Sequence, residues 1–536
     1  MFNISRDLSV KQWFTSISTF SLVGVILLSF FWFDALFLLI VLLPLIALGY
    51  HDMYYSEHTL LRLYPIIGHF RYIFESIRPE IQQYFVESNI NGRPINREFR
   101  DLVYQRAKGV NDTRPFGTQF DVYRNGYEWV NHSMAPKEVV EHDPRIKFGG
   151  KDCLKPYLAS PLNISAMSFG ALSKNAILAL NKGAHLGDFA HNTGEGGLSP
   201  YHLKHGGDLV WQIGTGYFGC RGHDGNFNAE LFAEKAQIEQ VKMIEIKLSQ
   251  GAKPGHGGIL PAIKLTEEIA DIRHVPMGQD VVSPPAHNAF STPIGLLKFI
   301  RQLRELSGGK PVGFKLCIGR KDEFLAICKA MLSTKIYPDF ITIDGGEGGT
   351  GAAPIELTNS VGTPLREGLV FVHNALIGCG LRHHIKLIAS GKTFSAFHIF
   401  RLMALGADTV NAARAMMLAL GCIQSRHCNT DKCPTGIATQ DARRYNALNV
   451  DKKGQRVFQF HQAMIENLME FLAAAGLQKL SQIEPKHVNQ RSHQNDIRHF
   501  GELYERLAEN CLLAEDTTPK GWQASWQLAN ENSWDL

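Results

Sequence analysis

The distribution of apolar residues separates the N-terminus from the rest of the chain. Residues 14–50 are nearly all apolar, and Asp34 is the one charged residue among them. A membrane-spanning helix needs about 20 apolar residues, so this stretch holds either two short helices, residues 14–33 and 35–50, or one long tilted helix. A charge in mid-bilayer is costly, whereas a turn at the interface exposes Asp34 to water. The pattern therefore favours a membrane helical hairpin.

Basic residues stand on both sides of this apolar stretch. Arg6 and Lys11 precede it, and Arg62, Arg71 and Arg78 follow it. The positive-inside rule places both flanks in the cytoplasm, which a hairpin allows and a single span does not. The stretch is too long for a cleavable signal peptide and has no small-residue cleavage site. We therefore expect residues 1–50 to anchor the protein in a membrane through residues 14–50, with the remainder on the cytoplasmic side.

Residues 51–155 carry weaker patterns, and we interpret them as a connector region without chemistry of its own. Helical periodicity runs through residues 54–63 and 66–88. Aromatic and polar residues alternate from 116 to 131, which predicts short strands or a hairpin around Gly126.

From residue 156 to residue 441, short apolar runs alternate with helical stretches. The candidate strands are residues 162–166, 189–192, 243–248, 312–318, 340–344, 385–389 and 409–411. This alternation predicts an α/β protein with a parallel sheet, most simply a (β/α)8 TIM barrel. A doubly wound sheet is the alternative, but no Gly-x-Gly-x-x-Gly opens a helix after the first strand. Residues 442–536 follow as a helical extension.

Composition agrees with a large enzyme domain plus additional segments. The chain has 536 residues, of which 49 are glycine and 45% are hydrophobic, so a barrel of about 250 residues fits within it. A formal net charge of +4 without a lysine or arginine tract gives no reason to expect nucleic acid as a partner. Nine cysteines without short-loop pairing do not form a disulfide framework, which is consistent with a reducing compartment.

Glycine-rich loops follow several of the candidate strands, which is where barrels place functional groups. Residues 165–173, including Met167 and Ser168, follow the first strand, and residues 192–197, Asn-Thr-Gly-Glu-Gly-Gly, follow the second. A later strand leads into residues 344–351, Asp-Gly-Gly-Glu-Gly-Gly-Thr-Gly. Such loops offer backbone N–H groups to anions or let a cofactor lie against the backbone.

Two lysines, Lys247 and Lys315, lie within otherwise apolar strands. Each needs an anionic partner, because burial of a lone charge is costly. A structural pair with Glu245 or Asp344 is one explanation, and a bound anionic ligand is the other.

Small residues and a cation follow the last two candidate strands. Ser390 and Gly391 come after one strand, and Ala413 and Arg414 come after the next. Barrels commonly bind a phosphate in the loops after strands seven and eight. A mononucleotide such as FMN would place its phosphate there and its flavin over the barrel mouth, against Lys315.

Three cysteines, Cys422, Cys428 and Cys433, are spaced Cys-x5-Cys-x4-Cys-Pro. Thiolates this close together can bind one iron–sulfur cluster, and a proline after the last ligand recurs in such loops. Structural zinc sites favour Cys-x2-4-Cys pairs and four ligands, and the only nearby fourth candidate is His427. The spacing favours an iron–sulfur cluster over zinc, and zinc over chance.

Taken together, these motifs resemble the FMN-binding synthase domain of glutamate synthase over residues 156–441. The matching runs are residues 168–173, 192–197, 250–255 (Gln-Gly-Ala-Lys-Pro-Gly), 283–285 (Ser-Pro-Pro), 348–352 and the three-cysteine loop. The resemblance implies a barrel with FMN and a [3Fe-4S] cluster that reductively aminates 2-oxoglutarate to L-glutamate. Electrons would reach FMN through the cluster, from a ferredoxin-like donor or a reductase subunit. A four-iron cluster with an outside ligand stays open.

The resemblance also implies which residues form the site. Gln250, Lys253 and Arg273 match family residues that bind 2-oxoglutarate, and Glu195 matches a glutamate near the reacting atoms. A dicarboxylate needs two cationic or donor groups, of which arginine supplies a bidentate one. The alternatives are a solvent-facing Arg273 and a Glu195 that caps its own glycine-rich turn. The residues expected to bind FMN are Met167, Ser168, Lys247, Lys315, Gly349, Gly351, Ser390, Gly391, Ala413 and Arg414.

The chain also departs from the family. It begins Met1-Phe2 and continues into the apolar stretch, so we expect no glutaminase domain and an outside source of ammonia, such as a separate glutaminase. Tyr217 replaces a cationic family residue, and His256 replaces an acidic one. These changes leave open another amine, such as methylamine, or another 2-oxoacid. A non-catalytic membrane electron-transfer subunit is a further alternative, which the retained substrate residues disfavour. An α-hydroxyacid oxidase is a weaker one, because its chemistry needs no cluster.

Overall fold

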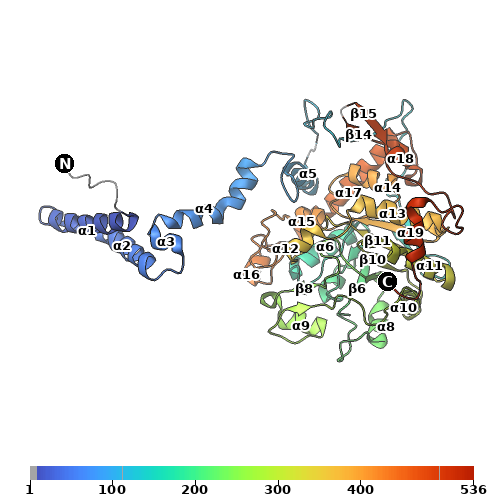
Figure 1. Cartoon of the computed structure of the whole chain (residues 1–536), viewed down its shortest axis with the longest axis horizontal. Coiled ribbons are helices and arrows are strands. Elements are labelled where there is room, and N and C mark those ends of the chain that lie inside the picture. Colours follow the sequence, from blue (N-terminus) through green and yellow to red (C-terminus); the bar gives the residue numbers. More distant parts are fainter. Residues whose placement is uncertain (1–8, 111–112, 494, 536) are drawn as a thin grey trace. The chain divides into compact units, whose positions relative to one another are not determined.

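The computed structural model describes residues 9–110, 113–493 and 495–535. Met1, Phe2 and Arg6, on which part of the anchor prediction rests, lie outside the described residues. The chain divides into two compact units, Met1–Arg97 and Glu98–Leu536, which are described separately (Figure 1). The division falls inside the expected connector, and the other domain limits stay predictions.

The first unit begins with two apolar helices, α1 (Val10–Ser29) and α2 (Leu39–Tyr54), joined through a 3-10 helix at Phe33–Leu38. Ser9 starts α1 with a capping box, because its hydroxyl accepts from the backbone of Gln12 and the Gln12 side chain accepts from Ser9 N. By length and composition, α1 and the continuous segment Phe33–Tyr54, which includes the 3-10 helix and α2, could each cross a membrane, with mean hydropathies of 1.4 and 2.3. The helix is interrupted between them, so the two-helix prediction is confirmed over a single long helix.

Two further helices complete this unit, α3 (Thr59–Leu63) and α4 (Gly68–Ile81), and a π-helical turn at Gln82–Val86 extends α4. A buried carboxylate fixes where α4 begins. Asp52 Oδ2, near the end of α2, accepts the backbone N–H of Ile66 at 3.0 Å and lies 2.9 Å from His69 Nε2. Ile66 has a positive φ of 63°, an uncommon backbone conformation for a β-branched residue.

The second unit is built around a closed barrel of eight parallel strands, in the order β10-β11-β12-β13-β4-β5-β6-β7. The strands are β4 (Leu162–Ile164), β5 (His191–Asn192), β6 (Leu209–Ile213), β7 (Val241–Lys247), β10 (Val312–Leu316), β11 (Phe340–Asp344), β12 (Lys386–Ser390) and β13 (Thr409–Ala412). The predicted TIM barrel is therefore confirmed, and the doubly wound alternative is wrong.

One strand of the barrel, β6, was not among the candidate strands. Its sequence, Leu-Val-Trp-Gln-Ile, is buried at every position, which includes the polar Gln212. Gln212 is stable there because its Nε2 donates to Glu245 Oε1 at 2.6 Å. A polar residue with a buried partner breaks the continuous apolar run that identifies barrel strands.

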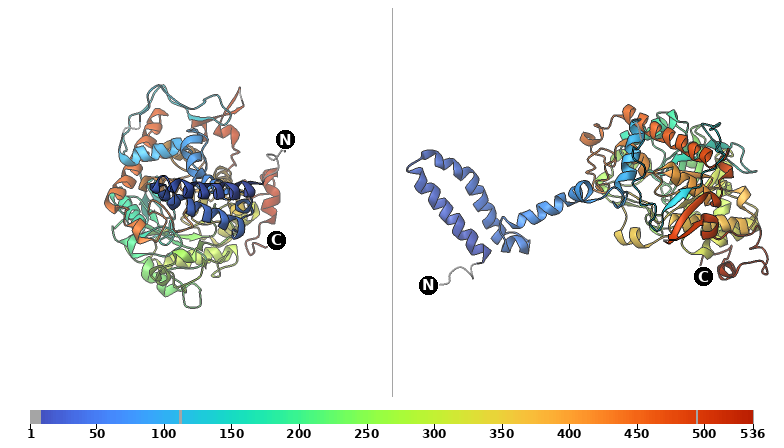
Figure 2. Two further views of the ribbon diagram at one scale, coloured as in Figure 1. Left: turned by 90° about the vertical axis from the view of Figure 1, so that its left-hand side faces the viewer. Right: turned by 90° about the horizontal axis from the view of Figure 1, so that it is seen from above.

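Helices surround the barrel, as Figures 1 and 2 show. They are α6 (Lys174–Leu186), α8 (Ala229–Ala236), α10 (Pro293–Leu306), α11 (Lys321–Thr334), α13 (Leu365–Gly378), α14 (Ala396–Ala404), α15 (Arg414–Leu420) and the long α17 (Val450–Ala474). Side chains cap the starts of α6, α8, α10, α14 and α17: Ser173, for example, accepts the Ala176 N–H at the start of α6. Between β7 and α10 the chain inserts the two-stranded β8 (Ile259–Leu260) and β9 (Val281–Val282) around α9 (Glu267–Arg273).

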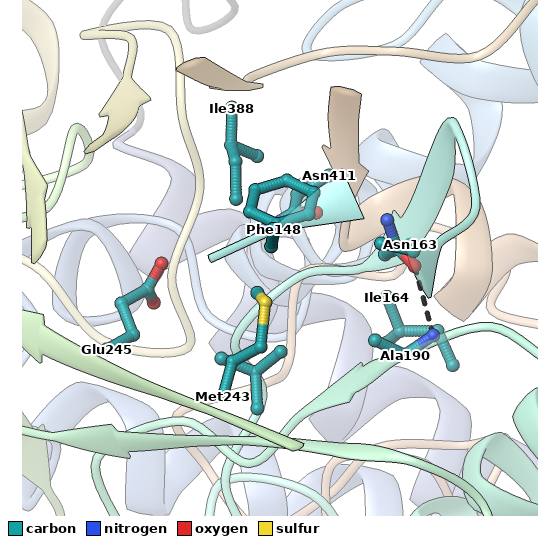
Figure 3. Close-up of a pocket in the computed structure, with 10 residues that line it drawn as sticks. Phe148, Asn163, Ile164, Ala190, Met243, Glu245, Ile388 and Asn411 are labelled. Atoms are coloured by element: carbon teal, nitrogen blue, oxygen red, sulfur yellow. Dashed lines mark hydrogen bonds between the residues drawn. The ribbon is translucent and has the colours of Figure 1, made fainter. Parts of the chain in front are cut away.

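A small hairpin, β2 (Ile146–Phe148) and β3 (Tyr157–Ala159), contributes to the barrel core. Phe148 is fully buried and meets Phe340 edge to face, with ring centroids 5.8 Å apart. Figure 3 shows it beside a small cavity that Met243, Ile388 and Glu245 also line. Apolar side chains from the hairpin and the strands therefore form this core, and the carboxyl group of Glu245 is buried among them.

Of the two alternatives for residues 116–131, a short strand is confirmed, whereas the local hairpin around Gly126 is wrong. The one strand there, β1 (Glu128–Val130), pairs antiparallel with β14 (Val488–His493), which pairs with β15 (Asp496–His499). Asn489 Nδ2 donates to Asn131 Oδ1 at 2.7 Å beside this sheet. Local alternation predicted the strand but could not identify a partner more than 350 residues away.

The C-terminal segment packs on the barrel helices through its tryptophans. Trp522, in α19 (Lys520–Leu528), stacks on Phe371 of α13 with ring centroids 5.2 Å apart. Lys329 Nζ of α11 lies 4.8 Å from the Trp526 ring centroid.

Candidate active site

A buried ion pair joins the ends of two barrel strands. Lys247 is the last residue of β7, and its Nζ donates to Glu195 Oε1 at 2.8 Å. Glu195 lies in the loop after β5, with 16% of its side chain exposed, against 8% for Lys247. Burial alone would raise the pKa of Glu195, but Lys247, Arg273 and Lys253 outweigh burial, and its pKa is lowered. The carboxylate is therefore ionised at neutral pH.

Glycines closely enclose the Glu195 carboxylate. A Cβ added at Gly258 would lie 1.9 Å from Glu195 Oε1, and one at Gly214 would lie 2.5 Å from Oε2. The loop itself approaches the loop after β4, since a Cβ on Gly194, whose φ is 64°, would meet Ser168 N at 2.8 Å. Glycine is thus required at these positions for steric reasons, and the carboxylate can occupy only one place.

Arg273, the last residue of α9, points into the site rather than into solvent. It is only 4% exposed, and its Nη2 donates to Phe169 O at 3.1 Å. Its guanidinium lies over the Phe218 ring, 5.1 Å from the centroid, and burial lowers its pKa to about 10. Arg273 Nε has no hydrogen-bond partner among the described residues. The solvent-facing alternative is therefore wrong, and a buried guanidinium keeps one N–H available for a ligand.

Lys253 is the third cation at this position, and it is 1% exposed. Its Nζ donates to Ala352 O at 2.9 Å, and burial together with Lys247 lowers its pKa to about 8. Gln250, in the same loop, is half-buried. The site therefore holds three cationic side chains and one carboxylate, an excess of positive charge that suits a dianionic ligand.

Of the two strand lysines, Lys247 has a different partner from the one first considered, and Lys315 lies near the expected one. Lys247 pairs with Glu195 instead of Glu245. Lys315 Nζ lies 3.9 Å from Asp344 Oδ2, as the structural-pair alternative proposed, although Asp344 Oδ2 also accepts Gly251 N at 2.8 Å.

The residues expected at the cofactor phosphate lie at the ends of β12 and β13. Ser390 Oγ is 3.4 Å from Ser165 Oγ, and Arg414 Nη2 donates to Glu347 O at 2.8 Å. Gly391 has a positive φ of 154°, and a Cβ on Gly349 would lie 3.2 Å from the Arg414 side chain. Met167, Ser168 and Ala413 lie in the adjoining strand-end loops, whereas Gly351 is exposed with open space around it. These groups fit an anionic mononucleotide, because small residues surround a largely buried guanidinium.

The three cysteines of the loop influence one another electrostatically. Burial, with smaller contributions from Cys428 and Cys433, raises the pKa of Cys422 to about 12, although the Gln424 N–H opposes the rise. Burial also opposes ionisation of Cys433, but the Thr435 hydroxyl and the N–H groups of Ala438, Thr435 and Ile437 outweigh it, and its pKa is lowered.

Backbone donors aimed at a sulfur suit a cluster ligand. Among the described residues no group of three or more His, Cys, Asp or Glu is placed to hold a metal ion. A cluster binds each thiolate to a different iron, so its ligands lie farther apart than the ligands of one ion.

Sequence reasoning missed Lys264 and His287. Lys264 is 2% exposed, and its Nζ donates to Ala171 O and to Cys428 O, so it joins the loop after β4 to the cysteine loop. His287 Nδ1 lies 3.0 Å from Tyr217 OH, and its Nε2 lies 3.0 Å from Lys247 O. Lysine in the apolar run Pro-Ala-Ile-Lys-Leu was the same signal that identified Lys247, whereas nothing in the sequence marked His287.

Comparison with known proteins identifies the family. The family model described as the conserved region in glutamate synthase matches residues 111–478. The chain belongs to the glutamate synthase family. The resemblance seen over residues 156–441 is thus confirmed.

Relatives within the glutamate synthase family align over most of the chain. The glutamate synthase large subunit-like protein YerD of Bacillus subtilis is 38% identical over 508 residues, which is 87% of this chain and 96% of YerD. The archaeal glutamate synthase [NADPH] of Methanocaldococcus jannaschii is 34% identical over 67% of this chain and 66% of its own length. The archaeal-type glutamate synthase [NADPH] of Thermotoga maritima is 32% identical over 73% and 74%. Among solved structures, a mutant flavocytochrome b2 with pyruvate bound aligns with a TM-score of 0.42 and 10% identity over 78% of this chain and 85% of that one.

Proposed function

We propose that this protein is a glutamate synthase that reductively aminates 2-oxoglutarate to L-glutamate with ammonia supplied from outside the chain. Membership of an oxidoreductase family supports the reaction class. The observation that carries the substrate is the buried group of Lys247, Lys253 and Arg273 around Glu195. The Glu195 carboxylate compensates only part of this positive charge. The two carboxylates of 2-oxoglutarate would supply the remaining negative charge.

FMN fits the ends of β10, β12 and β13. Arg414, Ser390 and Gly391 would hold its phosphate, and Lys315 with the loop at Met167 and Ser168 would hold the ring. When bound, FMN supplies the hydride that reduces a carbon held next to it. The chain's share of the reaction is to bind and orient that carbon and to exclude water from it.

The substrate groups have separate roles in this proposal. Arg273 offers its unpartnered Nε to one carboxylate of 2-oxoglutarate, and Lys253 Nζ binds the other. Gln250 contributes a neutral donor to the same ligand. Glu195 stays ionised, so it can bind an ammonium ion and accept a proton from it at the carboxylate oxygen that Lys247 does not occupy.

Cys422, Cys428 and Cys433 would bind a [3Fe-4S] cluster through which electrons enter. The N–H groups aimed at Cys433 Sγ support thiolate ligation there. Lys264 bridges the cysteine loop and the loop after β4, so the two cofactor sites share a rigid contact. A ferredoxin-like protein or a reductase subunit would supply the electrons.

The hairpin α1–α2 would anchor the enzyme in a membrane with the barrel on the cytoplasmic side. The lengths and hydropathies of the two helices support this proposal, as do Lys11 and Arg62 on their flanks.

The test is anaerobic purification of the full chain in detergent, followed by visible and EPR spectroscopy and assays with reduced methyl viologen as donor. We expect flavin bands, a three-iron signal and formation of glutamate from 2-oxoglutarate and ammonium. Faster turnover with methylamine than with ammonium would support the other-amine alternative. Spectra without turnover would support an electron-transfer subunit, and a colourless protein that contains zinc would contradict the redox proposal.

A further inference from the structure

Helix α4 and the turn after it expose an apolar stripe that no described residue of the first unit covers. The side chains on the stripe are each at least 40% exposed, and they are Ile67, Phe70, Ile73, Phe74, Ile77, Ile81, Tyr84 and Phe85. At 3.6 residues per turn the positions from Ile67 to Ile81 fall within an arc of about 120° on one side of the helix, and Tyr84 and Phe85 follow in the π-helical turn. A soluble helix buries such an arc against a core, and this one does not.

The rest of the α4 surface is polar and charged. Arg71 and Arg78 border the apolar arc, and Arg71 Nη2 pairs with Glu75 Oε1 at 2.7 Å. Ser76 and Pro79 lie on the opposite side, and both are exposed. With these charges among 14 residues, α4 is too polar and too short to span a bilayer. Exposure of its continuous apolar side to water would nevertheless be unfavourable.

The start of α4 is fixed to the end of the second apolar helix. Asp52 of α2 binds both Ile66 N and His69 Nε2, and a Cβ on Gly68 would lie 2.8 Å from Leu61 Cδ2. Figure 2, in its right-hand view, shows α4 leaving the base of the hairpin and running across the direction of its helices. A helix that starts at the membrane surface and runs across the spanning helices lies along that surface.

We propose that residues 67–85 form an interfacial helix, whose apolar side lies at the boundary between head groups and acyl chains of the bilayer that the hairpin enters. The inference rests on the proposed membrane anchor and adds a second contact to it. Arg71 and Arg78, at the edge of the apolar arc, reach the lipid phosphates with their guanidinium groups while their aliphatic stems stay on apolar surface. The partner of this surface is therefore lipid, bound mainly through apolar area.

The experiment compares two single tryptophan additions in the full chain, reconstituted into phosphatidylcholine vesicles with and without brominated acyl chains. Phe74→Trp places the probe on the apolar side, and Ser76→Trp places it about 160° around the same turn. The natural tryptophans of the first unit, Trp13 and Trp32, lie in the hairpin and report its insertion in the unchanged protein. Emission of each added tryptophan is obtained by subtraction of the unchanged protein.

We expect brominated lipid to quench most of the emission added by Phe74→Trp, at a blue-shifted wavelength, and little of that added by Ser76→Trp. Equal quenching of both variants, or of neither, while Trp13 and Trp32 are quenched would overturn the interfacial helix and leave the anchor intact. Absence of quenching in the unchanged protein would overturn the anchor itself. A blue shift of Phe74→Trp without quenching would show that the stripe packs against a second copy of the chain.

Discussion

Two glutamates on neighbouring layers of the barrel, the buried Glu245 and the partly exposed Glu195, have different hydrogen-bond and charge partners. Glu245 and Lys247 are two residues apart on β7, so their side chains face the same side of the strand. Lys247 at the end of the strand forms the ion pair with Glu195. Glu245 accepts from three neutral donors, Asn192 Nδ2, Gln212 Nε2 and Thr342 Oγ1, at 2.6–2.8 Å. Glu195 instead faces cations.

The difference separates a structural site from a functional one. Around Glu245 three donors match a single carboxylate, and nothing is left for a ligand. Around Glu195 the cations outnumber the carboxylate, and Arg273 Nε lacks a partner in the described part of the chain. Incomplete pairing, rather than burial or charge alone, is the reason we propose this part of the barrel as the substrate site.

The largest expected effect is a loss of stability when Glu245, the carboxylate with three hydrogen-bond donors, is replaced. Glu245→Leu leaves three buried donors without an acceptor, which should cost about 3–6 kcal/mol of unfolding free energy. Glu245→Gln keeps one acceptor and should lose less than half as much. Denaturant unfolding of the full chain in detergent measures both. A loss below about 1 kcal/mol for Glu245→Leu would mean that water satisfies these donors and that the contrast between the two glutamates is false.

Substitution of Arg273 should leave the fold intact and remove substrate binding. Arg273→Lys removes the unpartnered Nε donor and replaces a planar guanidinium by a point charge, so it should lower kcat/KM for 2-oxoglutarate about 100-fold, which corresponds to about 3 kcal/mol. Arg301→Lys is the matched control, because Arg301 is 58% exposed on α10 and should show no change. If both variants keep full kcat/KM, Arg273 is structural and the charge excess does not bind substrate.

The pH dependence of kcat/KM should show that Lys253 has no full carboxylate partner of its own among the described residues. The pKa of Lys253 is about 8, so its charge is present below pH 8 and is lost above it. We expect kcat/KM for 2-oxoglutarate to fall about tenfold per pH unit above that value. Lys253→Arg should remove this fall, since a guanidinium stays protonated across the range. An unchanged profile in Lys253→Arg would assign the titration to another group.

The smallest expected effect is at Tyr217, which stands where the family has a cation. Its hydroxyl binds His287 Nδ1 and the Ala289 N–H, so Tyr217→Phe should cost about 1 kcal/mol of stability and change KM for 2-oxoglutarate less than threefold. Steady-state kinetics and unfolding measure the two together. A tenfold change in KM would show that the Tyr217 hydroxyl contacts the substrate, so that Tyr217 would be a substrate-site residue like Glu195.

The sequence predicted the barrel because short, mostly apolar runs alternate with helical stretches. It missed β6, since Gln212 interrupts the run for a hydrogen bond that only the fold reveals. Motif order predicted that Lys253 and Glu195 lie near each other, and in the structure Lys253 lowers the pKa of Glu195. Motif order could not predict that Lys247 pairs with Glu195 rather than Glu245. Glu245 is two residues from Lys247 on β7, whereas Glu195 comes from another strand end, and only the fold shows which carboxylate the lysine reaches.

The pairing of β1 with β14 has a consequence for synthesis. Asn131 and Asn489 are 358 residues apart, so the sheet that joins the two flanks of the barrel cannot form until almost the whole chain has left the ribosome. At 5–20 residues per second this delay is roughly 20–70 s. The apolar hairpin emerges well before that, so β1 waits unpaired on a chain that can already be at a membrane. Pulse proteolysis of stalled nascent chains should find Glu128–Val130 sensitive until residues beyond 490 emerge.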